Sequence, residues 1–284
     1  GVRTGANMHT LAPMRYFKMN GCGNDFVILD ARARGALPLS QAQARAIADR
    51  QSGIGCDQVI AIERSIRGDA FMRIWNASGG EVDACGNATR CVAWLLMEEG
   101  GAVSRRIETA AGMLYAERAG DKIISVDMGS PLLRWEEIPL ARAMDTARLE
   151  FSAGEFDGPG AVNMGNPHAV FFVHDVATVP IETLAPQVEC DPLFPERVNV
   201  GFAEVRGAGQ IRLRVWERGV GLTKACGTGA CAVLVAAHRQ GRAGRKAEII
   251  MDGGSLEIEW RPGDDRVLMT GPVELEDTAE LPAA

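Results

Sequence analysis

The sequence contains no apolar run long enough to span a membrane. A transmembrane helix needs about 20 consecutive apolar residues, and no stretch of the 284-residue chain approaches that length. An apolar share of 46% and a charged share of 24% are typical of a soluble globular protein. We therefore expect no membrane partner. The length favours two domains, since single hydrophobic cores rarely grow beyond about 250 residues.

Basic charge is also scarce. The chain has a formal net charge of -7 at pH 7, and its lysines and arginines form no long cluster. A protein binds nucleic acid by neutralising phosphates with a basic face. This balance therefore argues against a nucleic-acid partner, and a small-molecule substrate is the simpler expectation.

No charged-then-apolar secretory leader opens the sequence, and its seven cysteines are an odd number. Reduced thiols in the cytoplasm fit this pattern better than a set of disulfides. Residues 1–13 lack apolar periodicity and are expected to be a tag remnant or a disordered extension. The pairs Cys85/Cys91 and Cys226/Cys231 lack the tighter spacing usual in zinc sites, so no metal is predicted.

Two cysteine-bearing segments of the chain resemble each other. Residues 84–91 and 225–231 both begin with Ala-Cys-Gly, and Cys226 lies 141 positions after Cys85. Three further pairs of polar residues recur at a spacing of 141 or 142: Asn24 with Asn166, Gln58 with Asn199, and Asn76 with Glu217. Four landmarks in one register indicate an internal duplication.

Each half of the duplication predicts strands followed by one buried helix. From Cys85 to the glycines at 100–101, and from Cys226 to Gly241, the residues have a helical pattern and are mostly apolar. Helices that are apolar on most sides lie inside a fold. Short alternating segments around them predict strands.

The expected fold class is α+β. It would consist of two similar, pseudo-symmetric domains, each a curved, mostly antiparallel β-sheet or barrel wrapped around a central helix. The N-terminal domain would comprise residues 14–130 plus 271–284 and carry Cys85. The C-terminal domain would comprise residues 131–270 and carry Cys226. The proline-containing residues 129–159 show weak periodicity and are expected to connect the two domains.

Cys85 and Cys226 each stand at the first turn of a predicted helix. Unpaired backbone N–H groups and the helix dipole stabilise an anion there, which lowers the pKa of a thiol from its usual value near ~8.5. The glycines that follow expose further N–H donors, which suit a carboxylate. If two such helix ends flank the α-carbon of an amino acid, one thiolate can remove the α-proton while the opposite thiol delivers another. The pattern favours a cofactor-independent, two-base inversion.

Other interpretations of single residues stay open. A lone cysteine is more often a small buried hydrophobe than a catalyst, and that interpretation is kept for five of them: Cys22, Cys56, Cys91, Cys190 and Cys231. His168 is either a core histidine or a residue near the site. Glu217 and Arg218 form either a solvated ion pair or a clamp for a zwitterion. The Asn and Gln landmarks either cap turns or bind ligand.

Five segments carry a close resemblance to the diaminopimelate epimerase family: residues 18–26, 76–91, 164–168, 197–202 and 216–229. The resemblance extends over residues 14–273. It implies interconversion of L,L- and meso-diaminopimelate without metal or pyridoxal phosphate. It also implies a homodimer, and two domains that close over the substrate.

The resemblance further implies roles for individual residues. Cys85 would donate the proton to the L,L substrate and Cys226 would accept one, with His168 and Glu217 tuning the ionisation of the thiols. Substrate contacts would come from eleven positions: Asn24, Gln58, Asn76, Gly86, Asn87, Asn166, Asn199, Glu217, Arg218, Gly227 and Thr228. The chain departs from many relatives at Ser78, where they carry Asp. Its C-terminal tail also lacks an aromatic residue that some relatives use near their dimer contact.

Two other functions are kept as alternatives. A proline or hydroxyproline racemase also uses two cysteines, but proline has no second amino-acid end for an Asn-rich pocket and Arg218 to hold. A thiol-based redox or anion-binding module would instead cycle a disulfide between Cys85 and Cys226.

Overall fold

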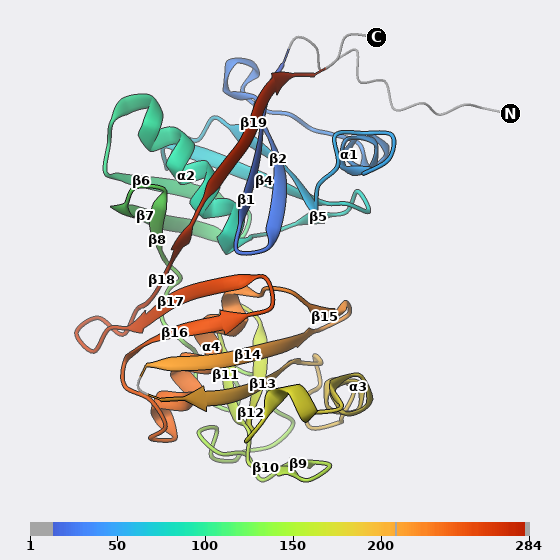
Figure 1. The fold of residues 1–284 in the computed structure, drawn as a ribbon, viewed down its shortest axis with the longest axis vertical. Helices are drawn as coiled ribbons and strands as arrows, with labels where there is room; N and C mark the ends of the chain where they lie inside the picture. The colour runs from blue at the N-terminus through green and yellow to red at the C-terminus, as the bar shows by residue number, and fades with distance from the viewer. Residues whose placement is uncertain (1–13, 208, 282–284) are drawn as a thin grey trace, which may run out of the picture. The chain divides into compact units, whose positions relative to one another are not determined.

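The structure is a computed structural model that describes residues 14–207 and 209–281. The chain forms two compact units (Figure 1): unit 1 runs to Val126 and resumes at Gly271, and unit 2 is Asp127–Thr270. From the sequence, the two transitions are expected after residues 130 and 270. The expected tag remnant or extension at residues 1–13 lies outside the described residues.

Unit 1 is a twisted sheet with one long helix and one short helix. Its elements are β1 Arg15–Gly21, β2 Asn24–Asp30, the 3-10 turn η2 Arg32–Arg34, α1 Gln41–Ala48, β3 Gln58–Glu63, β4 Ala70–Asn76, β5 Glu81–Val82, α2 Gly86–Gly100, β6 Ser104–Thr109, β7 Gly112–Gly120, β8 Ile123–Asp127 and, after the return of the chain, β19 Glu274–Glu280. β1 pairs antiparallel with both β2 and β19, so residues near the two ends of the chain share one sheet.

The elements of unit 2 are β9 Ser152–Ala153, β10 Phe156–Asp157, β11 Gly160–Asn163, β12 Pro167–Phe172, the 3-10 turn η3 Val176–Thr178, α3 Ile181–Glu189, β13 Asn199–Arg206, β14 Gln210–Glu217, β15 Gly221–Thr223, α4 Gly227–Arg239, β16 Lys246–Met251, β17 Gly254–Trp260 and β18 Val267–Pro272. From β11 onward, unit 2 repeats the order of elements from β1 to β8, whereas β9, β10 and β19 have no counterpart in the other unit.

The strand pairing repeats between the units. β2 pairs parallel with β3 as β12 does with β13, and β4 pairs parallel with β6 as β14 does with β16. The register repeats as well, because Phe26 lies opposite Gln58 in unit 1 and His168 lies opposite Asn199 in unit 2. The predicted α+β fold of two pseudo-symmetric domains is confirmed, with two parallel strand pairs in each otherwise antiparallel unit.

Each unit buries its long helix. Nearly the whole of α4 is inaccessible from Gly229 to Ala237, and α2 is buried from Asn87 to Trp94. α4 packs on β11, β12 and β17, and α2 packs on β1, β6 and β7. A helix of small and apolar residues is stable in such a place because burial of its apolar surface against the sheet stabilises it. This packing fixes the position of each helix, and so of the cysteine at its N-terminus.

Residues 129–159 differ from the expected connection. They hold little regular structure beyond the two-residue pair β9 and β10, but Ile138, Leu140 and Leu149 lie in the same hydrophobic cluster as Phe171 and Phe202. Their apolar side chains reach the core from irregular turns, so neither a helical nor a strand period marks them in the sequence. This segment is a packed part of unit 2.

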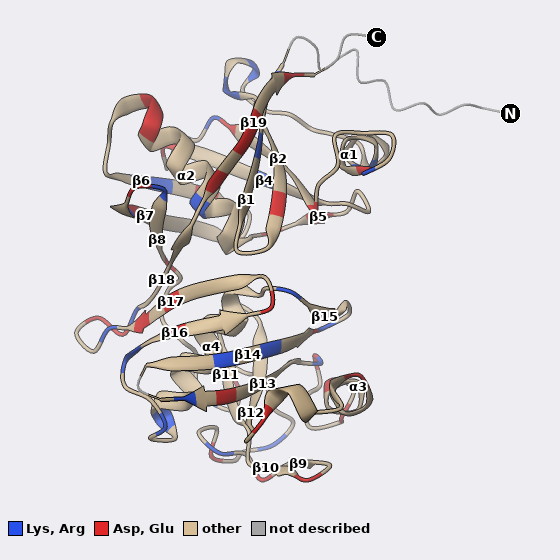
Figure 2. Ribbon diagram, viewed as in Figure 1, with Lys and Arg blue, Asp and Glu red and all other residues tan. Residues whose placement is uncertain are grey.

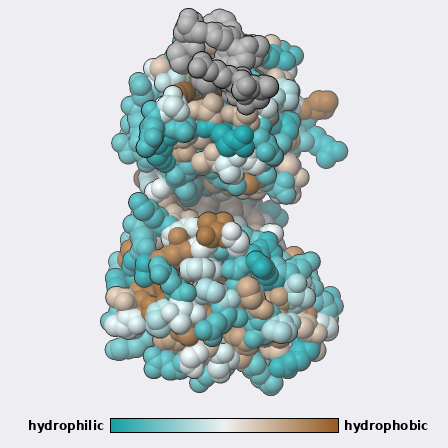
Figure 3. Space-filling model, turned by 90° about the vertical axis from the view of Figure 1, so that its right-hand side faces the viewer, coloured by the Kyte–Doolittle hydropathy of each residue, from teal (hydrophilic) through white to brown (hydrophobic). Residues whose placement is uncertain are grey.

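The surface carries charges of both signs on both units (Figure 2). On the face shown in Figure 3 the surface is largely hydrophilic with scattered apolar side chains. The most exposed large apolar residues are Ile66, Val103 and Val220. No described helix has the length and apolar character required to cross a membrane.

Candidate active site

Cys85 is the N-cap residue of α2. Its backbone is extended, with φ -154° and ψ 115°, and its side chain is half-buried. The Cys85 carbonyl accepts hydrogen bonds from the backbone N–H of Thr89 at 3.0 Å and from its hydroxyl at 2.8 Å. The thiol therefore stands at the positive end of a fixed helix dipole, which favours its thiolate form.

Four of the predicted substrate residues in unit 1 form two amide pairs. The Asn87 side chain donates to Oδ1 of Asn24 at 2.6 Å, and the Gln58 side chain donates to Oδ1 of Asn76 at 3.1 Å. Oδ1 of Asn87 and Oε1 of Gln58 are buried and have no hydrogen-bond partner in the described protein. Buried acceptors of this kind usually bind something. The two atoms are suited to an ammonium group or to water.

Cys226 is the N-cap residue of α4, with φ -144° and ψ 109°. Its side chain accepts a hydrogen bond from the Gly229 N–H at 3.4 Å and lies 3.6 Å from the hydroxyl of Thr228. Cys226 is only 7% exposed, so it is more enclosed than Cys85. A donated N–H bond to sulfur stabilises the thiolate relative to the thiol.

His168 connects to this sulfur through Thr228. Nε2 of His168 lies 3.0 Å from the Thr228 hydroxyl and 2.9 Å from Oδ1 of Asn166. Burial, assisted by the positive charge of Arg218, lowers the pKa of His168 to about 3, so the ring is neutral at pH 7. Because Asn166 offers an oxygen, Nε2 carries the proton in the tautomer that satisfies it. The Thr228 hydroxyl is then free to point its own proton at the Cys226 sulfur.

Glu217 ends β14 beside the same thiol. Burial raises the pKa of its carboxyl, while hydrogen bonds with Thr223 and Cys226 act in the opposite direction and leave a net increase. A carboxylate with a raised pKa in contact with a thiol is a better acceptor for the thiol proton.

Asn199 and Arg218 are placed differently from the other expected substrate residues. The Asn199 amide donates to the Pro167 carbonyl at 2.9 Å, and its oxygen accepts the Arg218 backbone N–H at 2.7 Å. Asn199 is buried, and one amide hydrogen remains for a ligand. The Arg218 guanidinium donates to the Glu196 carbonyl at 2.9 Å.

The remaining cysteines have a different electrostatic setting. Burial raises the pKa of Cys56 to about 11 and that of Cys91 to about 12, and it also raises the pKa of Cys22. These three thiols therefore stay protonated near neutral pH. In the described part of the chain, no three His, Cys, Asp or Glu side chains gather closely enough to hold a metal ion.

Sequence reasoning missed an ionic network beside the amide pairs of unit 1. Asp25 accepts hydrogen bonds from Lys18 at 2.6 Å and from Arg50 at 2.8 and 2.9 Å. Arg50 also bonds Asp57 at 2.9 Å, and Asn24 donates to Asp57 at 3.4 Å. Although burial raises it, these cationic donors hold the pKa of Asp25 well below its usual range. The signal was the position of Asp25 and Asp57 next to Asn24 and Gln58 in the sequence.

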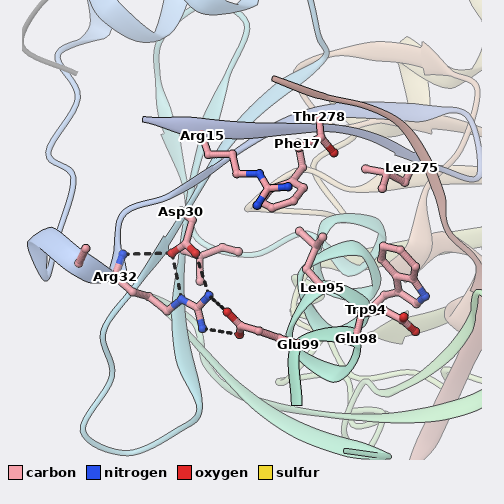
Figure 4. Close-up of a pocket in the computed structure, with 12 residues that line it drawn as sticks. Arg15, Phe17, Asp30, Arg32, Trp94, Leu95, Glu98, Glu99, Leu275 and Thr278 are labelled. Carbon is pink, nitrogen blue, oxygen red and sulfur yellow. Dashed lines mark hydrogen bonds and ion pairs between the residues drawn. The ribbon is translucent and has the colours of Figure 1, made fainter. Parts of the chain in front are cut away.

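A groove of about 800 Å³ lies elsewhere in unit 1 (Figure 4). Its lining includes Phe17, Leu275 and, from the C-terminal half of α2, Trp94 and Glu99. Trp94 follows Cys85 by nine positions along the helix, which corresponds to about 14 Å. The groove is therefore separate from the thiol.

Comparison with solved structures defines the class of fold. The chain matches a phenazine biosynthesis PhzC/PhzF protein from Clostridium difficile with TM-score 0.68 at 12% identity, over 95% of this chain and 99% of the other. It also matches a hydroxyproline epimerase from Agrobacterium vitis with TM-score 0.61 at 17% identity, over 94% and 90%. At these identities the likeness concerns the fold alone.

Sequence relatives define the family. The family model for diaminopimelate epimerase matches residues 16–133 and 160–276. Diaminopimelate epimerases from Acidiphilium cryptum and Phenylobacterium zucineum are 57% and 55% identical, over 95% and 94% of this chain and 96% and 97% of theirs. The chain belongs to the diaminopimelate epimerase family, whose named members are isomerases.

Proposed function

We propose that this protein is a cofactor-independent epimerase that interconverts L,L- and meso-diaminopimelate. One observation carries the proposal: two duplicated helices each begin at a cysteine. The first turn of one helix carries the Asn87–Asn24 amide pair, and the Thr228 hydroxyl lies beside the cysteine of the other. Family membership names the substrate, and the two thiols supply a base and an acid.

The reaction begins with the Cys226 thiolate. It removes the α-proton of the L,L substrate, and the electron pair of the broken C–H bond moves onto the substrate carboxylate. The N–H groups at the helix N-termini stabilise that charge. Cys85 delivers its thiol proton to the opposite face of the carbon, which leaves Cys226 protonated and Cys85 ionised. In the reverse direction the two residues exchange roles.

Glu217 and the His168–Thr228 pair prepare the Cys226 thiolate. The Glu217 carboxylate accepts the thiol proton, a transfer that its raised pKa favours. The neutral His168 donates its Nε2 proton to Asn166, and the Thr228 hydroxyl donates to the sulfur. This neutral donor lowers the free energy of the thiolate without adding a positive charge.

The amide side chains bind the amino-acid end that does not react. Diaminopimelate carries a second ammonium and carboxylate, so a site with neutral acceptors and an arginine discriminates it from smaller amino acids. The buried oxygens of Asn87 and Gln58 supply acceptors for an ammonium group. Asn76, Asn166, Asn199 and Arg218 complete this set in the proposal.

The proposal extends to assembly and location. A homodimer follows from the family resemblance, and static light scattering on purified protein at micromolar concentration would test it. The cysteines are held as thiols, which supports a reducing compartment such as the cytoplasm. Dialysis against a chelator should leave turnover unchanged if no metal takes part.

The activity test compares two substrates. Reduced protein without added cofactor is incubated separately with L,L-diaminopimelate and with L-proline, and the stereoisomers are separated by chiral chromatography. We expect meso-diaminopimelate to form and L-proline to stay unchanged. Formation of D-proline alone would show a proline racemase. Full activity after oxidation in air would contradict the requirement for reduced thiols.

A further inference from the structure

The turn that follows Glu217 is fixed at three successive backbone N–H groups. The Arg218 N–H donates to Asn199 at 2.7 Å, the Gly219 N–H donates to Glu189 at 3.2 Å, and the Val220 N–H returns to the Glu217 carbonyl at 3.0 Å. Gly219 has φ +74°, which a residue with a side chain adopts only with strain. The conformation of the turn therefore depends on two side chains from outside it.

Glu189 is the less expected of these two side chains. It is the last residue of α3 and is 6% exposed. One carboxylate oxygen accepts the indole N–H of Trp216 at 2.9 Å, and the other accepts the Gly219 N–H. Arg197, whose side chain is 58% exposed, donates to the same oxygen at 3.2 Å and balances the charge.

Glu189 therefore hydrogen-bonds the residues on both sides of the Glu217–Arg218 pair. Trp216 immediately precedes Glu217, and Gly219 immediately follows Arg218. A carboxylate accepts at both oxygens, and bonds from neutral N–H groups to an ionised acceptor are stronger than neutral ones. One buried charge thus holds the residues before and after Glu217, which contacts Cys226, and Arg218, which is a substrate residue only in the proposed function.

We propose that Glu189 is a positioning residue for the epimerase reaction, which sets the orientation of Glu217 and Arg218 without touching the substrate. This inference rests on the proposed function. Loss of the carboxylate should loosen the turn and move the Arg218 guanidinium, so substrate binding should suffer more than the chemical step. Neither the duplication nor the motifs indicate it, because the corresponding position 141 residues earlier is Ala48.

The test is Glu189→Gln with separate measurement of KM and kcat for diaminopimelate. A glutamine keeps the shape but turns one acceptor into a donor, which faces the indole or the Gly219 N–H. We expect KM to rise about tenfold or more, as the loss of one charge-assisted hydrogen bond implies, with kcat falling less than about threefold. A merely misfolded fraction would lower kcat and leave KM unchanged.

Glu204→Gln is the matched control. Glu204 also lies in unit 2 and accepts a backbone N–H, from Val176 at 3.0 Å, together with an arginine, Arg206. It makes no contact with the turn at 217–220 among its described hydrogen bonds. Its KM and kcat should equal those of the wild type.

The outcomes separate the two proposals. An inactive wild-type protein would overturn the proposed function. An active wild type with an unchanged KM in Glu189→Gln would overturn the role of Glu189 alone. If Glu189→Gln fails to fold, Trp216→Phe, which removes one donor to the carboxylate, decides instead: a KM increase of about threefold supports the role, and an unchanged KM overturns it.

Discussion

The two units place a cysteine at the same structural position but surround it differently. Cys85 is half-buried, and the helix start that follows it bonds the neutral amide of Asn24 through Asn87. Cys226 is buried and lies beside a carboxyl group and a hydroxyl that leads to His168. The repeated fold places the sulfur at the same point of each unit, and the side chains around the two sulfurs differ in their capacity to exchange a proton.

Three aligned positions account for the difference. Unit 1 has Phe26, Asn76 and Asn87 where unit 2 has His168, Glu217 and Thr228. Each change in unit 2 adds a group that can exchange or share a proton. We infer that unit 2 needs help to ionise an enclosed thiol, whereas the more open Cys85 relies on the helix end and on solvent. The comparison yields predictions of graded size.

The largest effect is expected from the cysteines themselves. Cys85→Ser and Cys226→Ser should each lower kcat by about a thousandfold or more, because a serine hydroxyl is far less acidic than a thiol and proton transfer contributes about 10² to 10⁴ to the rate. Circular dichroism should show an unchanged fold. A rate near that of the wild type in either variant would show that one thiol suffices.

A smaller effect should follow from giving unit 2 the residue of unit 1. Glu217→Asn should lower kcat/KM about 10- to 100-fold and move the rise of its pH profile to higher pH, since the Cys226 thiol loses its proton acceptor. Glu257→Asn, at an exposed glutamate of β17, serves as the control. An unshifted pH profile in Glu217→Asn would show that Glu217 does not take part in the ionisation of Cys226.

The His168 ring predicts a pH dependence of stability that unit 1 lacks at Phe26. Its folded pKa of about 3 lies below the unfolded value of 6.5, so between these values the unfolded chain binds a proton that the folded chain does not. The free energy of unfolding should therefore fall as pH decreases from 6.5 towards 3, by up to about 1.4 kcal/mol per pH unit from this residue.

Urea unfolding of the wild type and of His168→Phe across that pH window measures this contribution. The variant should show a shallower slope, whatever its absolute stability. Equal slopes would mean that His168 takes up its proton in the folded protein near pH 6.5.

The smallest effect is expected from the ionic network beside the unit 1 amides. Unit 2 cannot form the same network, because it has Pro167 and Val198 at the positions that match Asp25 and Asp57. Arg50 is more than half exposed, so Arg50→Ala should lower the free energy of unfolding by about 1 kcal/mol or less. Arg261→Ala, which removes an exposed pair with Asp264 on unit 2, is the control. A decrease of several kcal/mol in the free energy of unfolding would show that the network stabilises the fold as a buried ion pair does.

The sequence was informative where residues repeat and uninformative where a contact is made by one unit alone. The helical, apolar patterns that follow Cys85 and Cys226 predicted both helix starts, and short alternating segments predicted the strands around them. The sequence did not predict the contact of Thr228 with His168 or the hydrogen bond of Glu189 to the turn. Both contacts join side chains that are far apart in the sequence, so no local periodicity indicates them. Residues 129–159 resemble a connection in the sequence because their core side chains follow no regular spacing.

The opposed action of two thiols is tested most directly by the early distribution of deuterium when the wild type converts L,L-diaminopimelate in deuterated water. The first meso product should carry deuterium at its new α-position, while L,L substrate recovered at the same moment carries almost none, because the accepting sulfur returns the original proton. Early product that retains hydrogen, or substrate labelled as fast as product, would contradict the two-thiol mechanism.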